Sequence, residues 1–197
     1  MKTAKSFDTR KLVLLALLTA IVVVLQTLAA VVPLFPFTLT LVLVPIVIGA
    51  ALVNTLAGVW LGFVFGLVVL LTGDAGIFLA FNPAATIFVV LLKGAIAGLA
   101  SGAIYKLLER KGKTVAAITA AIVCPVVNTG IFIIGTYIFF LPIVIGFTEV
   151  FGYDNAAAII FLGFVGFNFP MELGINIILS PVIVRLIQYG QDRRLHG

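Results

Sequence analysis

The chain has 197 residues, of which 63% are hydrophobic and only 10% are charged. Soluble domains carry about 25% charged residues, so this composition and a mean hydropathy of +1.33 exclude an ordinary soluble protein and indicate an integral membrane protein. The formal net charge is +5, but the basic residues stand beside apolar segments without interleaved aromatic residues, which argues against a nucleic-acid partner.

Six apolar segments are predicted to cross the membrane as helices, since one crossing needs about 20 residues. The predicted fold class is therefore an all-α bundle of six transmembrane helices in a single integral membrane domain, residues 1–197. The second and third segments are short, so we expect them to be tilted or partly shielded by protein. Loops are predicted at 73–83 and 143–157. The predicted spans are about 12–31, 38–53, 56–72, 84–107, 115–141 and 158–188.

The basic residues predict the orientation. They cluster before the first span, in the loop after the fourth span and at the end of the chain, and six spans place all three clusters on one side. Cytoplasmic segments are enriched in Lys and Arg, so both termini are predicted to be cytoplasmic in a multi-pass protein of the cell membrane. The segments predicted on the outer side, 32–37, 73–83 and 143–157, contain no Lys or Arg.

Catalytic motifs are not found in the sequence. The lone histidine, His196, is next to the C-terminus, and the lone cysteine, Cys124, lies in an apolar segment beside a proline. There is no HExxH, Walker A or GxSxG sequence. We therefore expect neither an enzyme nor a metal site or cofactor in this chain.

The last span carries polar residues at four-residue steps: Asn168, Glu172, Asn176 and Ser180. At 3.6 residues per turn these side chains share one stripe of the helix. A carboxylate in the membrane costs about 3 kcal/mol on insertion scales, so something must face the stripe, and Lys93 in the fourth span is the natural ionic partner of Glu172.

Two interpretations of these buried polar groups remain open. They can satisfy one another as hydrogen bonds between helices, or they can line a polar pocket that opens towards the outer loops and holds an amphipathic solute. The second interpretation makes them candidate substrate-binding residues. Two aromatic residues that carry a hydrogen-bond donor and the asparagine in the loop at 73–83 are further candidates. The candidates are Trp60, Asn82, Lys93, Asn128, Thr129, Tyr137, Asn168, Glu172 and Asn176.

Small residues at four-residue spacing predict close helix packing, which drives helix association in lipid. Glycines recur in this way in the third span, from Gly58 to Gly66, and in the fourth span, from Gly94 to Gly102. Ala16 and Ala20 form a milder example in the first span.

The whole chain resembles the S components, the substrate-binding membrane subunits of energy-coupling factor (ECF) vitamin transporters. The resemblance rests on six spans with basic cytoplasmic ends, on Ala16-x3-Ala20, on "NPAATIFVVLLKGAIAGLASG" entering the fourth span, and on "NFPMELGINIILSPVIVRLI" in the sixth. It implies high-affinity binding of a micronutrient near the outer face. It also implies a transmembrane T component and two cytoplasmic ATPases as partners, with Ala16 and Ala20 matching the motif that docks on the T component.

The substrate is predicted from charge alone. Lys93 is the only cation outside the cytoplasmic clusters, against four carboxylates in the spans and outer loops. A dianion such as folate is poorly matched to this balance, so we favour a neutral ring-bearing vitamin such as riboflavin, ahead of pyridoxine-like compounds and pantothenate. The alternative function is a stand-alone secondary carrier or channel for a small solute.

Overall fold

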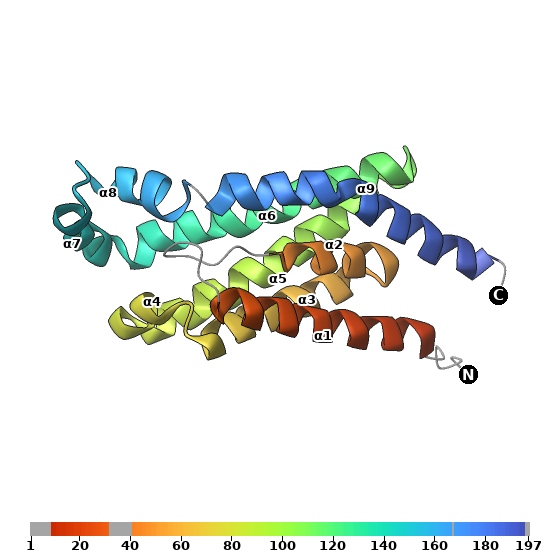
Figure 1. Cartoon of the computed structure of the whole chain (residues 1–197), viewed down its shortest axis with the longest axis horizontal. Helices are drawn as coiled ribbons and strands as arrows, with labels where there is room; N and C mark the ends of the chain where they lie inside the picture. The colour runs from red at the N-terminus through yellow and green to blue at the C-terminus, as the bar shows by residue number, and fades with distance from the viewer. Residues whose placement is uncertain (1–8, 32–40, 167, 196–197) are drawn as a thin grey trace, which may run out of the picture.

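The computed structural model describes residues 9–31, 41–166 and 168–195. All regular secondary structure in these ranges is helical, which confirms the predicted all-α class. The helices lie lengthwise in one bundle (Figure 1). In chain order they are α1 (Thr9–Val31), α2 (Leu43–Leu52), α3 (Thr55–Thr72), α4 (Gly76–Phe81), α5 (Pro83–Leu108), α6 (Lys113–Phe139), α7 (Leu141–Phe151), α8 (Ala156–Ala158), the π-helical segment η1 (Ile159–Phe164) and α9 (Asn168–Leu195).

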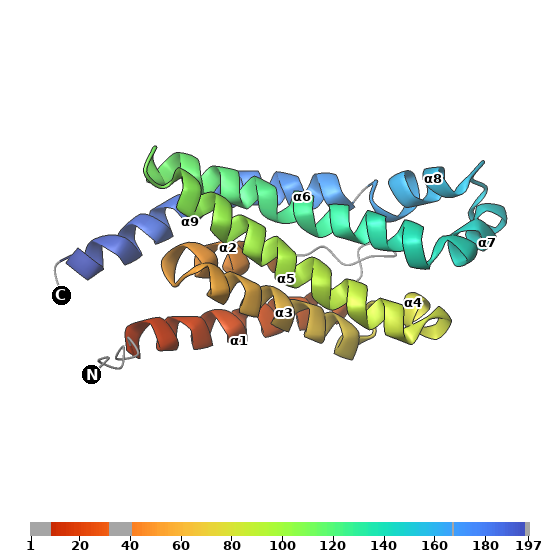
Figure 2. The ribbon, with the colours of Figure 1, turned by 180° about the vertical axis from the view of Figure 1, so that it is seen from behind.

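The two ends of the bundle differ. The start of α1, the end of α9 and the link between α5 and α6 lie at one end, which we call the terminal end (Figures 1 and 2). Helices α4, α7 and α8 lie at the other, which we call the loop end. The basic loop thus lies at the same end of the bundle as the first turn of α1 and the last turn of α9.

The predicted count of six spans is met only in part. Among the described residues, five helical stretches are long and apolar enough to cross a membrane. The remaining predicted span, the second, corresponds to helix α2, which has 10 residues. At 1.5 Å per residue α2 covers about half of a 30 Å hydrocarbon core. Eight of its residues are nonetheless buried, so α2 lies inside the bundle, and the first residues of its predicted span fall outside the described ranges.

Both predicted loops contain helices. Gly73, with φ 79°, ends α3, and the apolar sequence after it forms the short helix α4 before Asn82 begins α5. Helix α6 ends at Phe139, and Pro142 occupies the first turn of α7, a position where its missing N–H costs nothing. The Pro and Gly residues in these segments therefore mark boundaries between helices rather than irregular loops.

The last predicted span, 158–188, is interrupted. It is divided into α8, the π-helical η1 and α9, and the backbone N–H of Val165 donates to the carbonyl of Ile160, five residues earlier. Gly163 and Gly166 stand in this stretch, and glycine weakens a regular helix. The polar stripe of the sequence begins where α9 begins.

Glycine packing fixes the centre of the bundle, as its spacing predicts. A Cβ built on Gly62 would collide with the backbone carbonyl of Gly94, and one on Gly98 with that of Gly58. Helices α3 and α5 therefore touch backbone to backbone, an approach that only glycine permits. This contact holds α5, and with it Lys93, against the rest of the fold.

Candidate functional site

A group of polar side chains lies inside the bundle, and we call it the polar centre. It brings together α1, the link after α3, α5 and α9. Its members are connected pairwise by a hydrogen bond or by electrostatic attraction: Gln26, Asp74, Lys93, Glu172 and Asn176.

Lys93 is the basic residue of the polar centre. Its Nζ lies 5.4 Å from the ring centre of Phe132 and 5.8 Å from that of Phe65. Aromatic faces attract a cation at such distances. Of the carboxylates, Glu172 attracts Lys93 most strongly and Asp74 next. A direct ion pair between Lys93 and Glu172 stays a prediction.

Three of the four residues of the stripe on α9 face the interior of the bundle. Glu172, Asn176 and Ser180 are all buried. The Nδ2 of Asn176 donates to the backbone carbonyl of Glu172 at 2.8 Å, and the Oγ of Ser180 donates to the carbonyl of Ile177 at 2.7 Å. Asn168 is the first residue of α9, at the end of the helix nearest the loop end.

Gln26 and Asp74 are functional candidates that the sequence reasoning missed. Gln26 is fully buried on α1, and its Nε2 donates to Oδ2 of Asp74 at 3.3 Å. Asp74 directly follows the glycine that ends α3. A signal was available, because Gln26 is the only amide side chain in an otherwise apolar first span.

Several buried oxygen atoms in the described part of the chain have no hydrogen-bond partner. Leaving a buried acceptor unpaired costs about 1–3 kcal/mol, so each such group needs a reason to be there. A polar occupant would supply the missing donors. The four atoms are Gln26 Oε1, Asn128 Oδ1, Thr136 Oγ1 and Asn176 Oδ1.

Asn128 lies on the side of α6 that faces the polar centre. It is buried, one helical turn from Phe132, which contacts Lys93, and one turn from Cys124, on which Glu172 acts electrostatically. Thr129, the next residue, is half-buried. The structure therefore brings Asn128 to the polar centre.

An aromatic wall stands at the loop end of the polar centre. Phe78 of α4 meets Phe132, Phe140 and Phe164 edge to face, with ring centres 4.9–5.8 Å apart. Phe147 of α7 extends the wall through Phe164 at 6.4 Å. Because Phe132 contacts both Phe78 and Lys93, the wall and the cation are continuous.

The two aromatic candidates, Trp60 and Tyr137, lie outside the polar centre. Trp60 is 49% exposed on α3 in the half nearer the terminal end, and its Nε1 donates to Oγ1 of Thr19 on α1 at 3.2 Å. Tyr137 is 39% exposed near the end of α6. Asn82 begins α5, where its Oδ1 accepts from the backbone N–H of Ala85 at 3.1 Å.

Ala16 and Ala20 lie on the open face of α1. Both are exposed, whereas the buried side of α1 consists of Leu18, Val22 and Gln26. With 100° between successive residues, the two alanines lie opposite that side. Two small side chains are thus exposed on the face of α1 that points away from the bundle.

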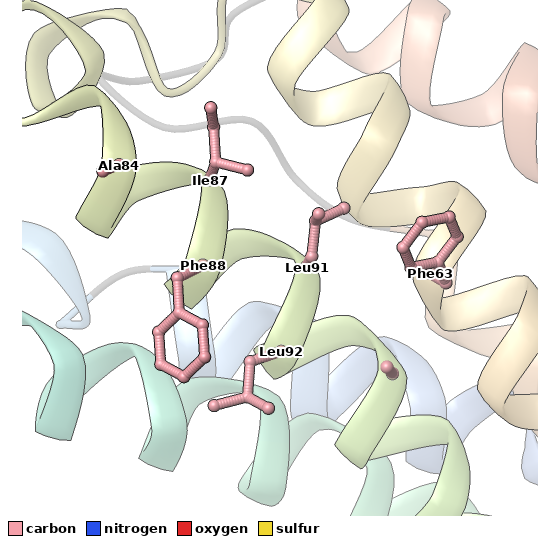
Figure 3. A pocket seen from close by; sticks show the side chains of 7 residues that line it. Phe63, Ala84, Ile87, Phe88, Leu91 and Leu92 are labelled. Atoms are coloured by element: carbon pink, nitrogen blue, oxygen red, sulfur yellow. The ribbon is translucent and has the colours of Figure 1, made fainter.

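A shallow groove between α3 and α5 is a separate feature (Figure 3). It is almost wholly apolar and includes none of the polar-centre residues, so it is suited to lipid rather than to a polar solute. Its lining consists of Phe63, Ala84, Ile87, Phe88, Leu91, Leu92 and Ala95.

Comparison with protein families decides the identity of the chain. The model of the family "ECF transporter, substrate-specific component" matches residues 10–184. The chain belongs to this family. No match was found among curated proteins or among solved structures.

The family gives the S component its general role. It is the substrate-specific subunit of an ECF transporter, a multi-pass membrane protein that binds a small molecule for transport and is not an enzyme. A T component and ATPases are the partners that membership implies.

Proposed function

We propose that this S component binds a water-soluble vitamin or related micronutrient in the polar centre, and that a neutral ring compound of the riboflavin type is the favoured substrate. The loop end faces the outside of the cell and the terminal end faces the cytoplasm. The vitamin enters at the loop end and is passed on by a complex with a T component and two cytoplasmic ATPases.

The observation that carries this proposal is the position of Lys93. Its Nζ lies near the faces of two phenylalanine rings and is attracted by two carboxylates, beside a wall of further aromatic rings. Such a site offers stacking surface and hydrogen bonds to one molecule, as small-molecule sites generally do. With two carboxylates for one lysine, it has no excess of positive charge with which to hold a dianion.

The predicted site residues divide accordingly. Lys93, Asn128, Glu172 and Asn176 contact the vitamin, and Asn168 is met first at the loop end. Trp60, Tyr137 and Asn82 are less suited to this role, because two are exposed on the bundle surface and the third caps a helix.

Docking uses the open face of α1. Ala16 and Ala20 let a helix of the T component approach closely at these two positions, because a small side chain keeps the two backbones near each other. The face is free for this purpose because the buried stripe of α1 lies on the opposite side.

Mass spectrometry tests the proposed substrate directly. The S component, purified in mild detergent from cells grown in vitamin-rich medium, is denatured and the released small molecules are identified. We expect one neutral ring-bearing vitamin in a near one-to-one ratio. Release of folate would contradict the favoured neutral ring substrate. Release of no vitamin, from a protein that also fails to bind one in titration, would contradict vitamin binding itself.

A further inference from the structure

The hydrogen bond between Gln26 and Asp74 fixes the orientation of the Gln26 side-chain amide. A carboxylate only accepts hydrogen bonds, so the contact at 3.3 Å must use the amide nitrogen of Gln26 as donor. The carbonyl oxygen is therefore the free end of the amide, and it is buried without a partner.

The same arrangement occurs on α9. The amide nitrogen of Asn176 donates to the backbone carbonyl of Glu172 at 2.8 Å, and its oxygen is buried without a partner. Asn128 on α6 has a third such oxygen. Three helices thus present unpaired acceptors, and only groups that donate hydrogen bonds can satisfy them.

Charge favours the same class of ligand. Lys93 is acted on by Glu172 and Asp74, so the described residues of the polar centre contain one cation and two carboxylates. An anion entering this centre would be repelled by the excess carboxylate, whereas an N–H or O–H group would not.

We infer that Gln26, oriented by Asp74, accepts a hydrogen bond from the transported substrate, and that the substrate is therefore an uncharged or cationic ring compound with N–H or O–H donors rather than a carboxylate. This inference rests on the proposed function, because it takes the polar centre as the binding site. It assigns to α1, through Gln26, a part in substrate recognition separate from the alanines on its open face.

The competing explanation is that Gln26 only fastens α1 to the link after α3. A fastening role and a recognition role differ in what they affect. The first changes the stability of the empty protein, whereas the second changes affinity for substrate. Thr27 offers a matched control, because it is the next residue, is exposed, and uses its hydroxyl on the carbonyl of Val23 in its own helix.

The experiment is isothermal titration of the purified full-length protein in mild detergent with two groups of probes. The first group, riboflavin, thiamine and pyridoxine, carries donors and no carboxylate. The second, biotin, pantothenate and folate, carries carboxylates. We expect tight binding by a member of the first group only.

Gln26→Met and Thr27→Leu are then titrated with the probe that binds. Gln26→Met keeps the side-chain volume but has no carbonyl, and it should weaken binding on the order of ten- to hundredfold. Thr27→Leu should leave affinity unchanged. Gln26→Leu replaces Gln26→Met if the latter does not purify as a monodisperse protein, and the comparison of probe groups needs only the wild-type chain.

The outcomes separate the two proposals. Tight binding of a carboxylate probe alone, or unchanged affinity in folded Gln26→Met, overturns the role of Gln26 and leaves vitamin binding standing. If no probe binds the wild-type chain, the proposed function is overturned and this inference with it.

Discussion

Gly62 of α3 and Gly94 of α5 face each other with no room for a side chain on either. A Cβ on Gly62 would collide with the carbonyl oxygen of Gly94, and a Cβ on Gly94 with that of Gly62. Because Lys93 precedes Gly94 in the chain, the contact that brings two backbones together also sets the depth of the cation in the bundle. Packing and the candidate site are therefore coupled at this point.

Gly62→Ala should destabilise the protein. The added methyl group has backbone on its far side and cannot be accommodated by a rotamer change, so we expect a loss of about 1–3 kcal/mol and a lower midpoint of thermal unfolding in detergent. Gly130→Ala on α6 is the matched control, because nothing lies within 4 Å of its Cβ. Equal midpoints of thermal unfolding for the two variants would show that the close contact of α3 with α5 does not determine the stability of the protein.

Ala16→Trp or Ala20→Trp should abolish uptake while leaving binding by the isolated subunit intact. A large side chain on the open face of α1 prevents close approach of the partner helix but does not reach the polar centre. The measurements are vitamin uptake by cells containing the full complex and titration of the purified variant. Ala103→Trp, at an exposed alanine of α5, is the control, and normal uptake by both docking variants would refute the docking role.

Single cysteines should report the orientation. Cys124 is fully buried and is replaced by serine, after which Thr9→Cys, Lys111→Cys and Asp154→Cys are made one at a time. An impermeant maleimide added to intact cells should label only the cysteine at position 154, because the positive-inside rule places the other two in the cytoplasm. Labelling at position 9 or 111, without labelling at 154, would show that the protein has the opposite orientation in the membrane.

Asn168→Ala and Glu172→Ala should weaken vitamin binding by about 1–3 kcal/mol, the cost of leaving the ligand group that each residue contacts without its hydrogen-bond partner. Asn176→Ala should matter less, because Asn176 lies about 6 Å deeper than Glu172 at 1.5 Å per residue. Ile178→Ala, at a side chain 75% exposed on the same helix, is the control. Titration and thermal unfolding are measured together, and unchanged affinity in well-folded Asn168→Ala would remove this residue from the site.

The sequence predicted those features that depend on regular periodicity. Glycines four apart produced the contact of α3 with α5, and polar residues four apart produced the inward stripe of α9. In both cases a single helix face decides what is buried. The helical class followed from the length of the apolar segments, whereas the predicted number of spans was met only in part.

Other features depend on contacts between distant segments and could not be predicted in this way. Asp74 was assigned to a loop, and only the folded chain brings it to Gln26, 48 residues away. The division of the last span into separate helical segments was also not predicted, because its apolar sequence pattern continues without a break through η1. Trp60 was chosen for its donor and aromatic surface, but its place on α3 puts it beside Thr19 instead.

Reconstitution tests the central claim most directly. Proteoliposomes are prepared with the chain alone and with the chain together with its T component and ATPases, and uptake of the vitamin identified by mass spectrometry is measured with and without ATP. The account predicts that the chain alone binds the vitamin but does not transport it, and that uptake requires the complete complex and ATP. Uptake at a comparable rate by the chain alone would contradict the account and identify a stand-alone carrier.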